Sequence, residues 1–400
     1  MAATRAASSP ARCSASRASR PRKARSAARA IPTTTSRSSP TGARSTSTSA
    51  RTPTPSSRPS SPRWASCAPT ARNSATKCSG RASPRPKASK PPERGLAAPG
   101  SPAIWFAATR PQFLSVTAVA VLVGLASAAG GGVPLHVGVA ALALAGALLV
   151  HAGANLVNDY HDRHADAGND ERLTPFTGGS RMIQDGLLGA RAVAACGHAL
   201  LALGALLGAG LALDGRPQLW ALGALGLALA IAYSAPPLRL SARGLGEPVI
   251  AAAWLLVVIG SDLAQRGGWS VVPVAAGAPM AMLVAAILLA NGFPDRTADA
   301  AAGKRTLVVL LGPRGAARGY LMLVAAAYLA LIAAAIVGAL PGTALAGMAA
   351  APVSLFAARQ LTLNAGCTPT SRLLPAIRAT ILAAHLYGLS VAAALLLARG

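Results

Sequence analysis

Residues 155–170 read N-L-V-N-D-Y-H-D-R-H-A-D-A-G-N-D and close a long run of apolar residues. The polar members Asn155, Asn158, Asp159, Asp162 and Asp166 fall at offsets 0, 3, 4, 7 and 11. A helix of about 3.6 residues per turn places side chains with this spacing along one face. The preceding run, residues 133–157, contains no Asp, Glu, Lys or Arg and has the length of a membrane span. The sequence therefore predicts a membrane helix that ends in a row of carboxylates and amides.

A second set of the same kind lies far downstream. Asn291, Asp295 and Asp299 follow one another at intervals of four residues, again where an apolar run ends. Carboxylates at a membrane boundary are costly unless they face a protein interior or a water-filled cavity, so they indicate a functional site. Two acidic helix ends in one membrane protein suggest a single shared site.

Charge and composition divide the 400 residues into two parts. Residues 1–100 contain 20 of the 38 Lys and Arg residues, a single acid, Glu93, and almost no large aliphatic side chains. Such a segment cannot bury enough apolar surface to offset the entropy of ordering, so we expect a disordered basic extension. A transit peptide, a basic arm and a mistranslated start are alternative origins for it. Because the extension lacks interleaved aromatic residues, we expect no nucleic-acid partner.

Residues 101–400 are rich in apolar runs and are predicted to form an all-α polytopic membrane domain. Nine runs approach the length that crosses about 30 Å of hydrocarbon. The nine predicted spans are residues 112–129, 133–157, 192–213, 218–233, 247–264, 271–291, 318–339, 343–360 and 375–397. The predicted fold class is therefore a bundle of nine transmembrane helices.

The distribution of basic residues predicts the orientation of this bundle. In residues 101–400, 14 of the 18 Lys and Arg residues lie in or beside the loops after the second, fourth, sixth and eighth spans. The positive-inside rule places those loops in the cytoplasm. Both acidic sets end on the same side. We therefore expect a multi-pass protein of the cell inner membrane whose active site faces the cytoplasm.

Clustered carboxylates and amides suit a hard cation. Mg²⁺ prefers oxygen ligands and is typically held by one or two carboxylates together with a substrate phosphate. The predicted metal ligands are Asp159, Asp162 and Asp166 for one ion, and Asp295 and Asp299 for another. Basic residues beside such acids are typical of polyphosphate sites, although positive-inside anchoring explains any single one equally well. The predicted binding residues are Asn155, Asn158, Asn291, Arg163, Arg181, Lys304 and Arg305.

Two further segments border the predicted site. Residues 174–188 begin with helix-breaking residues and are amphipathic, which suits a cap over the site. A double proline follows Tyr233 and forms a stiff turn that places this tyrosine at the cytoplasmic mouth. The sequence Gly303-Lys304-Arg305-Thr306 is not a P-loop, because Arg305 stands where that motif requires Ser or Thr.

The histidines carry less information than the acids. His161 and His164 flank Asp162 at i, i+3 spacing with no cysteine nearby, which disfavours a zinc site. Single histidines in apolar runs are more often hydrogen-bonded core residues than ligands. That interpretation applies to His151, His198 and His385.

With these residues the chain resembles the UbiA superfamily of intramembrane prenyltransferases. The family's first motif, N-D-x-x-D-x-x-x-D, stands here as Asn158, Asp159, Asp162 and Asp166. The second motif, D-x-x-x-D, stands as Asp295 and Asp299. Residues 233–247 and 291–312 are similar to the menaquinone branch, the 1,4-dihydroxy-2-naphthoate polyprenyltransferases. The resemblance covers residues 105–400 and implies the family's fold of nine helices.

The resemblance also implies an activity. It implies a Mg²⁺-dependent enzyme, surrounded by membrane lipid, that transfers a polyprenyl group from a polyprenyl diphosphate to an aromatic acceptor. The five aspartates would hold the metal, and Lys304 and Arg305 would neutralise the departing diphosphate. The candidate catalytic residues are Asp159, Asp162, Asp295, Asp299 and Tyr233.

Two alternatives remain open at this point. The segment F-T-G-G-S-R at residues 176–181 differs from the pattern expected of the menaquinone branch, so the acceptor could be of the homogentisate, chlorophyllide, haem or glycerophosphate type. A membrane transporter also keeps ionisable residues in a membrane cavity, but near the bilayer midplane. Both acidic sets of this chain end at one surface, which favours an enzyme that acts on an amphiphilic substrate.

Overall fold

The computed structural model describes residues 99–398, and the regular structure in that range is helical throughout. The predictions for the basic extension fall on residues 1–98, outside the described residues, apart from its last two positions. The α-helices are α1 (Pro102–Ala108), α2 (Pro111–Gly130), α3 (Val137–Ala167), α4 (Ala190–Leu213), α5 (Gln218–Ser234), α6 (Gly246–Arg266), α7 (Val272–Ala301), α8 (Leu307–Ile336), α9 (Ala351–Asn364) and α10 (Leu374–Leu397). Three 3₁₀ segments join them, η1 (Leu240–Arg243), η2 (Gly342–Ala350) and η3 (Thr370–Leu373).

The predicted membrane fold is confirmed. Between residues 99 and 398, eight helical segments are long and apolar enough to cross a membrane, with η2 and α9 counted as one, and α5 is a shorter apolar helix of 17 residues. Their positions follow the nine predicted spans closely, with one correction. The seventh span was predicted to begin at residue 318, but α8 begins at Leu307 and continues past a non-helical residue, Gly312, that precedes Pro313. The short helix α1 had not been predicted.

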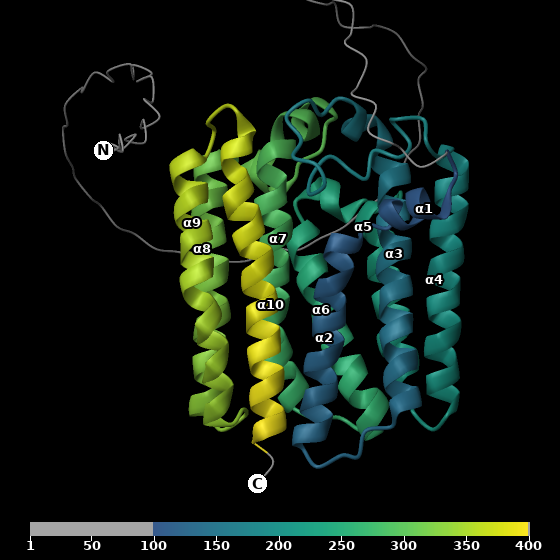
Figure 1. Ribbon diagram of the computed structural model, residues 1–400, viewed down its shortest axis with the longest axis vertical. Coiled ribbons are helices and arrows are strands. Elements are labelled where there is room, and N and C mark those ends of the chain that lie inside the picture. Colours follow the sequence, from purple (N-terminus) through teal and green to yellow (C-terminus); the bar gives the residue numbers. More distant parts are fainter. Residues whose placement is uncertain (1–98, 399–400) are drawn as a thin grey trace, which may run out of the picture. The chain divides into compact units, whose positions relative to one another are not determined.

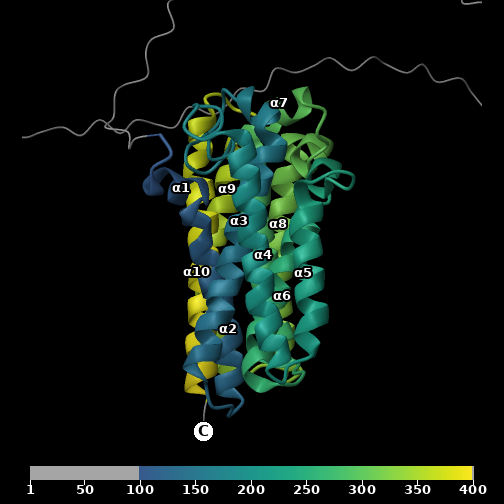
Figure 2. The ribbon, with the colours of Figure 1, turned by 90° about the vertical axis from the view of Figure 1, so that its right-hand side faces the viewer.

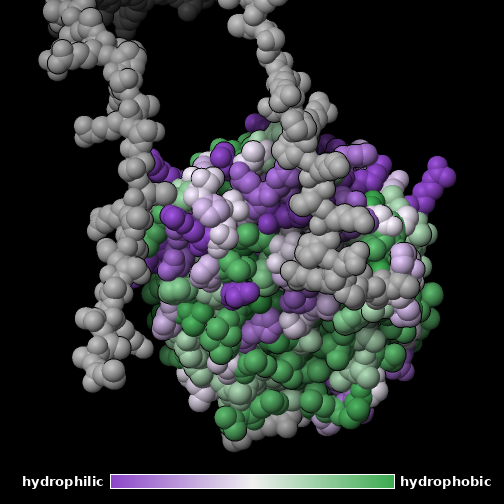
Figure 3. Space-filling view, turned by 45° about the horizontal axis from the view of Figure 1, so that its top comes forward, coloured by the Kyte–Doolittle hydropathy of each residue, from purple (hydrophilic) through white to green (hydrophobic). Residues whose placement is uncertain are grey.

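The helices α2 to α10 run side by side, and consecutive long helices point in opposite directions (Figures 1 and 2). The carboxyl ends of α3 and α7, which carry the two acidic sets, therefore lie at the same end of the bundle. In the space-filling view, hydrophilic residues gather at that end, whereas hydrophobic residues cover the sides below it (Figure 3). This distribution suits a bundle whose sides face lipid and whose acidic end faces water.

Glycines set the close approach of α3 to α4. A Cβ atom added at Gly153 would lie 2.8 Å from the carbonyl oxygen of Gly197, and one added at Gly197 would lie 3.1 Å from the carbonyl oxygen of Gly153. Small residues at such contacts allow the backbones of membrane helices to pack tightly, because apolar association provides little drive between helices in lipid. The glycine contact fixes α3, and with it the first acidic set, against its neighbour.

The buried core lies mainly among α2, α7, α8 and α10, and hydrogen bonds between helices hold it together. The Tyr320 hydroxyl lies 2.8 Å from Thr380 Oγ1, and the Tyr328 hydroxyl lies 2.8 Å from Ser354 Oγ. The Tyr387 hydroxyl donates to the Ala276 carbonyl at 3.0 Å. Buried polar groups are costly without partners, so these bonds define how the helices meet. They provide a rigid support for α7.

Candidate active site

The two acidic sets meet at Lys304, which follows the end of α7. The Lys304 Nζ atom lies 2.9 Å from Asp162 Oδ2 of α3 and 3.4 Å from Asp299 Oδ1 of α7. The structure thus joins side chains that lie more than 130 residues apart in the chain through one ammonium group. All three groups are buried. The expectation that the two sets share one site agrees with this geometry.

A second bridge joins the sets through the loop between α3 and α4, residues 168–189. Asn169 of this loop donates from Nδ2 to Asp295 Oδ1 at 2.5 Å. The Gly178 amide donates to the other oxygen of the same carboxylate at 3.3 Å. The loop is therefore tied to the second acidic set while it begins directly after the first.

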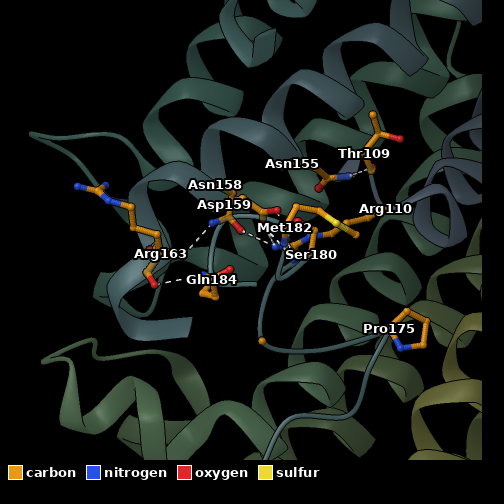
Figure 4. A network of polar contacts seen from close by, with 12 residues as sticks. Thr109, Arg110, Asn155, Asn158, Asp159, Arg163, Pro175, Ser180, Met182 and Gln184 are labelled. Atoms are coloured by element: carbon orange, nitrogen blue, oxygen red, sulfur yellow. Dashed lines mark hydrogen bonds and ion pairs between the residues drawn. The ribbon is translucent and has the colours of Figure 1, made fainter. Parts of the chain in front are cut away.

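Asp159 is held from two sides. Arg110 immediately precedes α2, and its guanidinium forms an ion pair with Asp159 Oδ1. The Ser180 amide donates to both Asp159 oxygens, at 3.3 and 3.2 Å. Figure 4 shows the Arg110 side chain and the loop at Ser180 converging on Asp159, while Asn155 donates to the Thr109 carbonyl at 2.9 Å. Asp159 is consequently the point where α3, the start of α2 and the loop are joined.

Gly179 allows the loop to lie directly on the acids. Its φ is +74°, in the left-handed region that favours glycine. A Cβ atom at this position would lie 2.5 Å from Asp166 Oδ2 and 3.4 Å from Asp159 Oδ1. The predicted cap of residues 174–188 does lie over the site, as an irregular loop that uses backbone amides as its contacts.

Two cavities adjoin at this end of the bundle. The first, of about 130 Å³, is called the polar cavity. Its charged lining residues are Arg110, Asp162, Asp166, Glu247, Asp295, Asp299 and Lys304. The second, of about 340 Å³, is called the apolar cavity and is lined mostly by aliphatic and glycine residues of α2 to α7. Both cavities share the lining residues Arg110, Phe113, Asn158, Tyr233, Leu288 and Asn291.

The two cations of the polar cavity, the buried Lys304 and the partly buried Arg110, keep their charge. Burial alone would lower the pKa of the Lys304 ammonium, but the carboxylates of Asp162 and Asp299 outweigh that cost and raise its pKa. Burial likewise would lower the pKa of Arg110, and the nearby carboxylates of Asp159 and Asp166 raise it instead. At neutral pH the polar cavity thus presents two fixed positive charges next to its acids.

The donors of the polar cavity fit Mg²⁺ by their chemistry. Four aspartate carboxylates and two amide side chains line it. Asn291 Oδ1 is buried and has no hydrogen-bond partner, so an oxygen acceptor is unused where the two cavities meet. Within residues 99–398, no three His, Cys, Asp or Glu side chains lie close enough to hold one ion by themselves. Mg²⁺ commonly needs only one or two carboxylates, because water and phosphate oxygens complete its shell.

The structure places the other predicted binding residues differently. Arg163 donates to the Tyr160 carbonyl at 2.6 Å, and its guanidinium stacks on the Tyr160 ring. Arg181 donates to the Asp166 carbonyl at 2.8 Å, so it supports the loop. Arg305 is exposed, and none of these three arginines lines either cavity.

The remaining predicted residues do line the cavities. Those that line both are Tyr233, Asn158 and Asn291, whereas Asn155 lines the apolar one.

Three residues of the site had not been predicted. These residues are Arg110, Asn169 and Glu247, and none of them had been assigned a role from the sequence. Glu247 is a buried carboxylate in the first turn of α6 that lines the polar cavity. Each is a single residue without periodic spacing, so the sequence carried no signal for it beyond the presence of a charge or amide near an apolar run.

The fold and the cavities define a multi-pass helical membrane protein with a cavity lined by charged residues at one end of the bundle, next to a cavity lined mostly by apolar residues. Residues 117–382 match the UbiA prenyltransferase family, and the chain belongs to that family. It is accordingly a prenyltransferase, which transfers an alkyl group other than methyl. The predicted resemblance and the predicted enzyme class are confirmed.

The chain is similar to proteins from several organisms. It is 33% identical over 299 residues, 73% of this chain and 96% of the relative, to a 1,4-dihydroxy-2-naphthoate octaprenyltransferase of Mycobacterium tuberculosis. The fold is similar to the apo structure of a UbiA homologue from Aeropyrum pernix, with a TM-score of 0.56, 20% identity, and coverage of 70% of this chain and 97% of that one. It is also similar to a UbiA homologue from Archaeoglobus fulgidus bound to DMAPP and Mg²⁺, with a TM-score of 0.50, 19% identity, and coverage of 72% and 99%.

Proposed function

We propose that this chain transfers a polyprenyl group from a polyprenyl diphosphate to 1,4-dihydroxy-2-naphthoate, with Mg²⁺ bound at the polar cavity. One observation carries the proposal: a charged cavity and an apolar cavity adjoin and share lining residues. A prenyl diphosphate has the same two parts in the same order. The naphthoate acceptor is supported by the curated relative, which matches over almost its full length.

The polar cavity suits the diphosphate. Lys304 and Arg110 supply fixed positive charge, and the loop amides near Asp159 and Asp295 hold the acids in place. The UbiA homologue from Archaeoglobus fulgidus binds DMAPP, a short prenyl diphosphate, together with Mg²⁺. When bound, Mg²⁺ would act as a Lewis acid and neutralise negative charge on the diphosphate leaving group. The candidate metal ligands are Asp162, Asp166, Asp295 and Asp299, which line the polar cavity, and Asp159, which does not line it and is paired with Arg110.

The reaction then follows from the placement of these charges. The bond between the allylic carbon and the diphosphate oxygen breaks, and its electron pair leaves with the diphosphate. Lys304 and Arg110 stabilise the charge that grows on that oxygen. An electron-rich ring carbon of the acceptor attacks the allylic cation. The ring carboxylate leaves as carbon dioxide, and the electron pair of the broken C–C bond restores the aromatic system, so no proton is lost overall. Tyr233, Asn158 and Asn291 border the junction of the two cavities, where the allylic carbon would lie.

The proposal includes an orientation. The polar cavity lies at the end of the bundle that holds the loops rich in arginine, which suits the cytoplasmic face of a cell inner membrane. The carboxyl end of α10 lies at the opposite end (Figure 1). An alkaline phosphatase fused after Gly400 should therefore be active outside the cytoplasm. If the phosphatase fusion is inactive and a green fluorescent protein fused at the same position is fluorescent, the orientation is the opposite of the one proposed.

A panel of acceptors tests the activity. Membranes that contain the protein are incubated with a radiolabelled polyprenyl diphosphate and, separately, with naphthoate, homogentisate and other aromatic acceptors, and products are identified by mass. We expect a labelled decarboxylated product with 1,4-dihydroxy-2-naphthoate, and none from membranes that carry the Asp295→Ala variant. Product with a different acceptor alone would refute the naphthoate assignment. No product with any acceptor, combined with substrate flux into proteoliposomes, would favour a transporter.

A further inference from the structure

Polar groups from three helices meet at one level of the apolar cavity. His151 of α3 and Trp254 of α6 line this cavity, and Thr117 of α2 lines it at the same place. His151 lies four residues before Asn155 and eight before Asp159, so it faces the same side of α3 as the first acidic set. It therefore lies about 12 Å along the helix from Asp159, below the polar cavity.

The contacts fix the orientation of the histidine ring. His151 Nδ1 lies 2.7 Å from Thr117 Oγ1, and Thr117 is almost fully buried. The His151 and Trp254 rings meet edge to face, with centroids 4.9 Å apart and planes at 85°. The prediction that His151 is a hydrogen-bonded residue is confirmed, but the residue also faces a cavity. Its Nε2 atom makes no hydrogen bond to any described residue.

The tryptophan at this level lacks a partner. Trp254 Nε1 is buried and has no hydrogen bond within the described part of the chain. A buried donor without a partner costs about 1–3 kcal/mol, so its retention beside a cavity points to a ligand that supplies an oxygen acceptor. The indole N–H and the histidine Nε2 together offer two hydrogen-bonding positions in a cavity whose wall is otherwise mostly aliphatic.

The chemistry of the two substrates decides which of them uses these positions. A prenyl tail is a hydrocarbon and gains nothing from a hydrogen-bonding group. The diphosphate is anionic and is matched by Lys304 of the polar cavity and by Arg110 at the junction of the two cavities. A hydroxylated aromatic acceptor carries ring oxygens and is otherwise apolar, so it fits a mostly aliphatic wall with two hydrogen-bonding groups.

We propose that His151 and Trp254 bind an oxygen substituent of the aromatic acceptor, and that Thr117 orients the histidine ring for this contact. This inference rests on the proposed prenyl transfer to an aromatic acceptor and deepens it, because it assigns the residues that select the acceptor. The acceptor ring then lies beside the prenyl tail, below the diphosphate, and reaches the allylic carbon from the apolar side.

The test separates acceptor binding from donor binding. His151→Phe keeps an aromatic ring against Trp254 but removes both nitrogens, and Trp254→Phe removes the indole N–H. Each variant is expected to raise KM for the acceptor about tenfold and to leave KM for the prenyl diphosphate within twofold. His198→Phe and Trp220→Phe are matched controls, because both residues are exposed and line neither cavity. Thermal stability in detergent identifies any variant that is misfolded, and His151→Leu, which also lacks both nitrogens, then replaces His151→Phe.

An acceptor analogue that lacks one ring hydroxyl sharpens the test. The wild-type protein should use this analogue about tenfold less well than the full acceptor, whereas His151→Phe should use both about equally. If only KM for the prenyl diphosphate rises, His151 and Trp254 contact the prenyl tail. If neither KM changes, the two residues make a structural contact. Either result overturns the inference. Wild-type protein that transfers no prenyl group to any aromatic acceptor would instead refute the proposed function itself.

Discussion

The polar and apolar cavities share part of their lining, yet they are built in different ways. In the polar cavity most charged groups are paired with one another or with a loop amide, as Lys304 is with Asp162 and Asp299. In the apolar cavity many aliphatic and glycine side chains from α2 to α7 contribute a little each. Under the proposed function, head-group recognition should depend on a few contacts that do not tolerate change, whereas tail binding should depend on many contacts that are individually replaceable.

The largest effect is expected from the acids that hold the loop. Asp159→Ala removes the partner of Arg110 and of the Ser180 amide, and Asp295→Ala removes the partner of Asn169 and of the Gly178 amide. In each variant turnover, measured by product formation, should fall to background. The protein should still insert in the membrane and fold, as measured by its elution profile in detergent. Asp185→Ala is the control, because this residue is exposed and its carboxylate pairs, within residues 99–398, only with Arg181, at 3.5 Å. Near-normal turnover in either acid variant would contradict a shared metal and diphosphate site.

Metal removal should produce a comparable loss. The acids of the polar cavity are matched in part by Lys304 and Arg110, and further positive charge is needed once a diphosphate enters. Membranes stripped with EDTA should lose activity, and Mg²⁺ should restore it. Full activity in the absence of any divalent ion would show that the two fixed cations alone support the departure of the diphosphate.

Helical spacing explains why the acids could be predicted from the sequence. Asp159, Asp162 and Asp166 lie on one helix, so their common face follows from local geometry alone. Alternating spans placed the ends of α3 and α7 on one side, because consecutive membrane helices must reverse direction. The fold and both acidic sets were therefore within reach of sequence reasoning.

Contacts between distant residues were not within reach. Arg110 meets Asp159 across 49 positions of sequence, and Asn169 meets Asp295 across 126. Such pairs depend on how helices cross and where a loop folds back, which spacing within one helix does not encode. Nothing in the sequence indicated that Trp254 belongs to a site, because one aromatic residue in an apolar run is usual for a membrane helix. Arg305 and Lys304 show the limit most clearly, because adjacent residues of similar charge occupy different environments.

That pair supports the next prediction. Lys304→Met removes the charge that bridges Asp162 and Asp299, and we expect about 10²–10³-fold lower kcat. Arg305→Met is the matched control, because it also removes one positive charge but from an exposed side chain outside both cavities. The comparison is made in the same membranes with saturating donor and acceptor. Equal losses in the two variants would mean that loop charge in general, and not the bridge, supports catalysis.

A smaller effect is expected where the loop touches the acids. In Gly179→Ala the new Cβ atom would lie 2.5 Å from Asp166 Oδ2, at a backbone φ of +74°. Left-handed backbone costs an alanine roughly 1–2 kcal/mol, so the loop should shift away from Asp159 and Asp166. We expect about tenfold lower kcat with little change in thermal stability. Gly186→Ala has a similar φ of +71° and open space around it, so it should leave kcat nearly unchanged.

The smallest effect is expected in the apolar cavity, and it should depend on the donor. Gly226 of α5 lines this cavity, and a Cβ atom added there would have open space around it. Gly226→Leu should therefore fold normally and fill part of the cavity. With a short prenyl diphosphate kcat should stay near the wild-type value, whereas with a long one KM should rise several-fold, because the tail competes with the new side chain for room. A loss of kcat that is equal for short and long donors would mean that the apolar cavity shapes the reacting centre and does more than accommodate the tail.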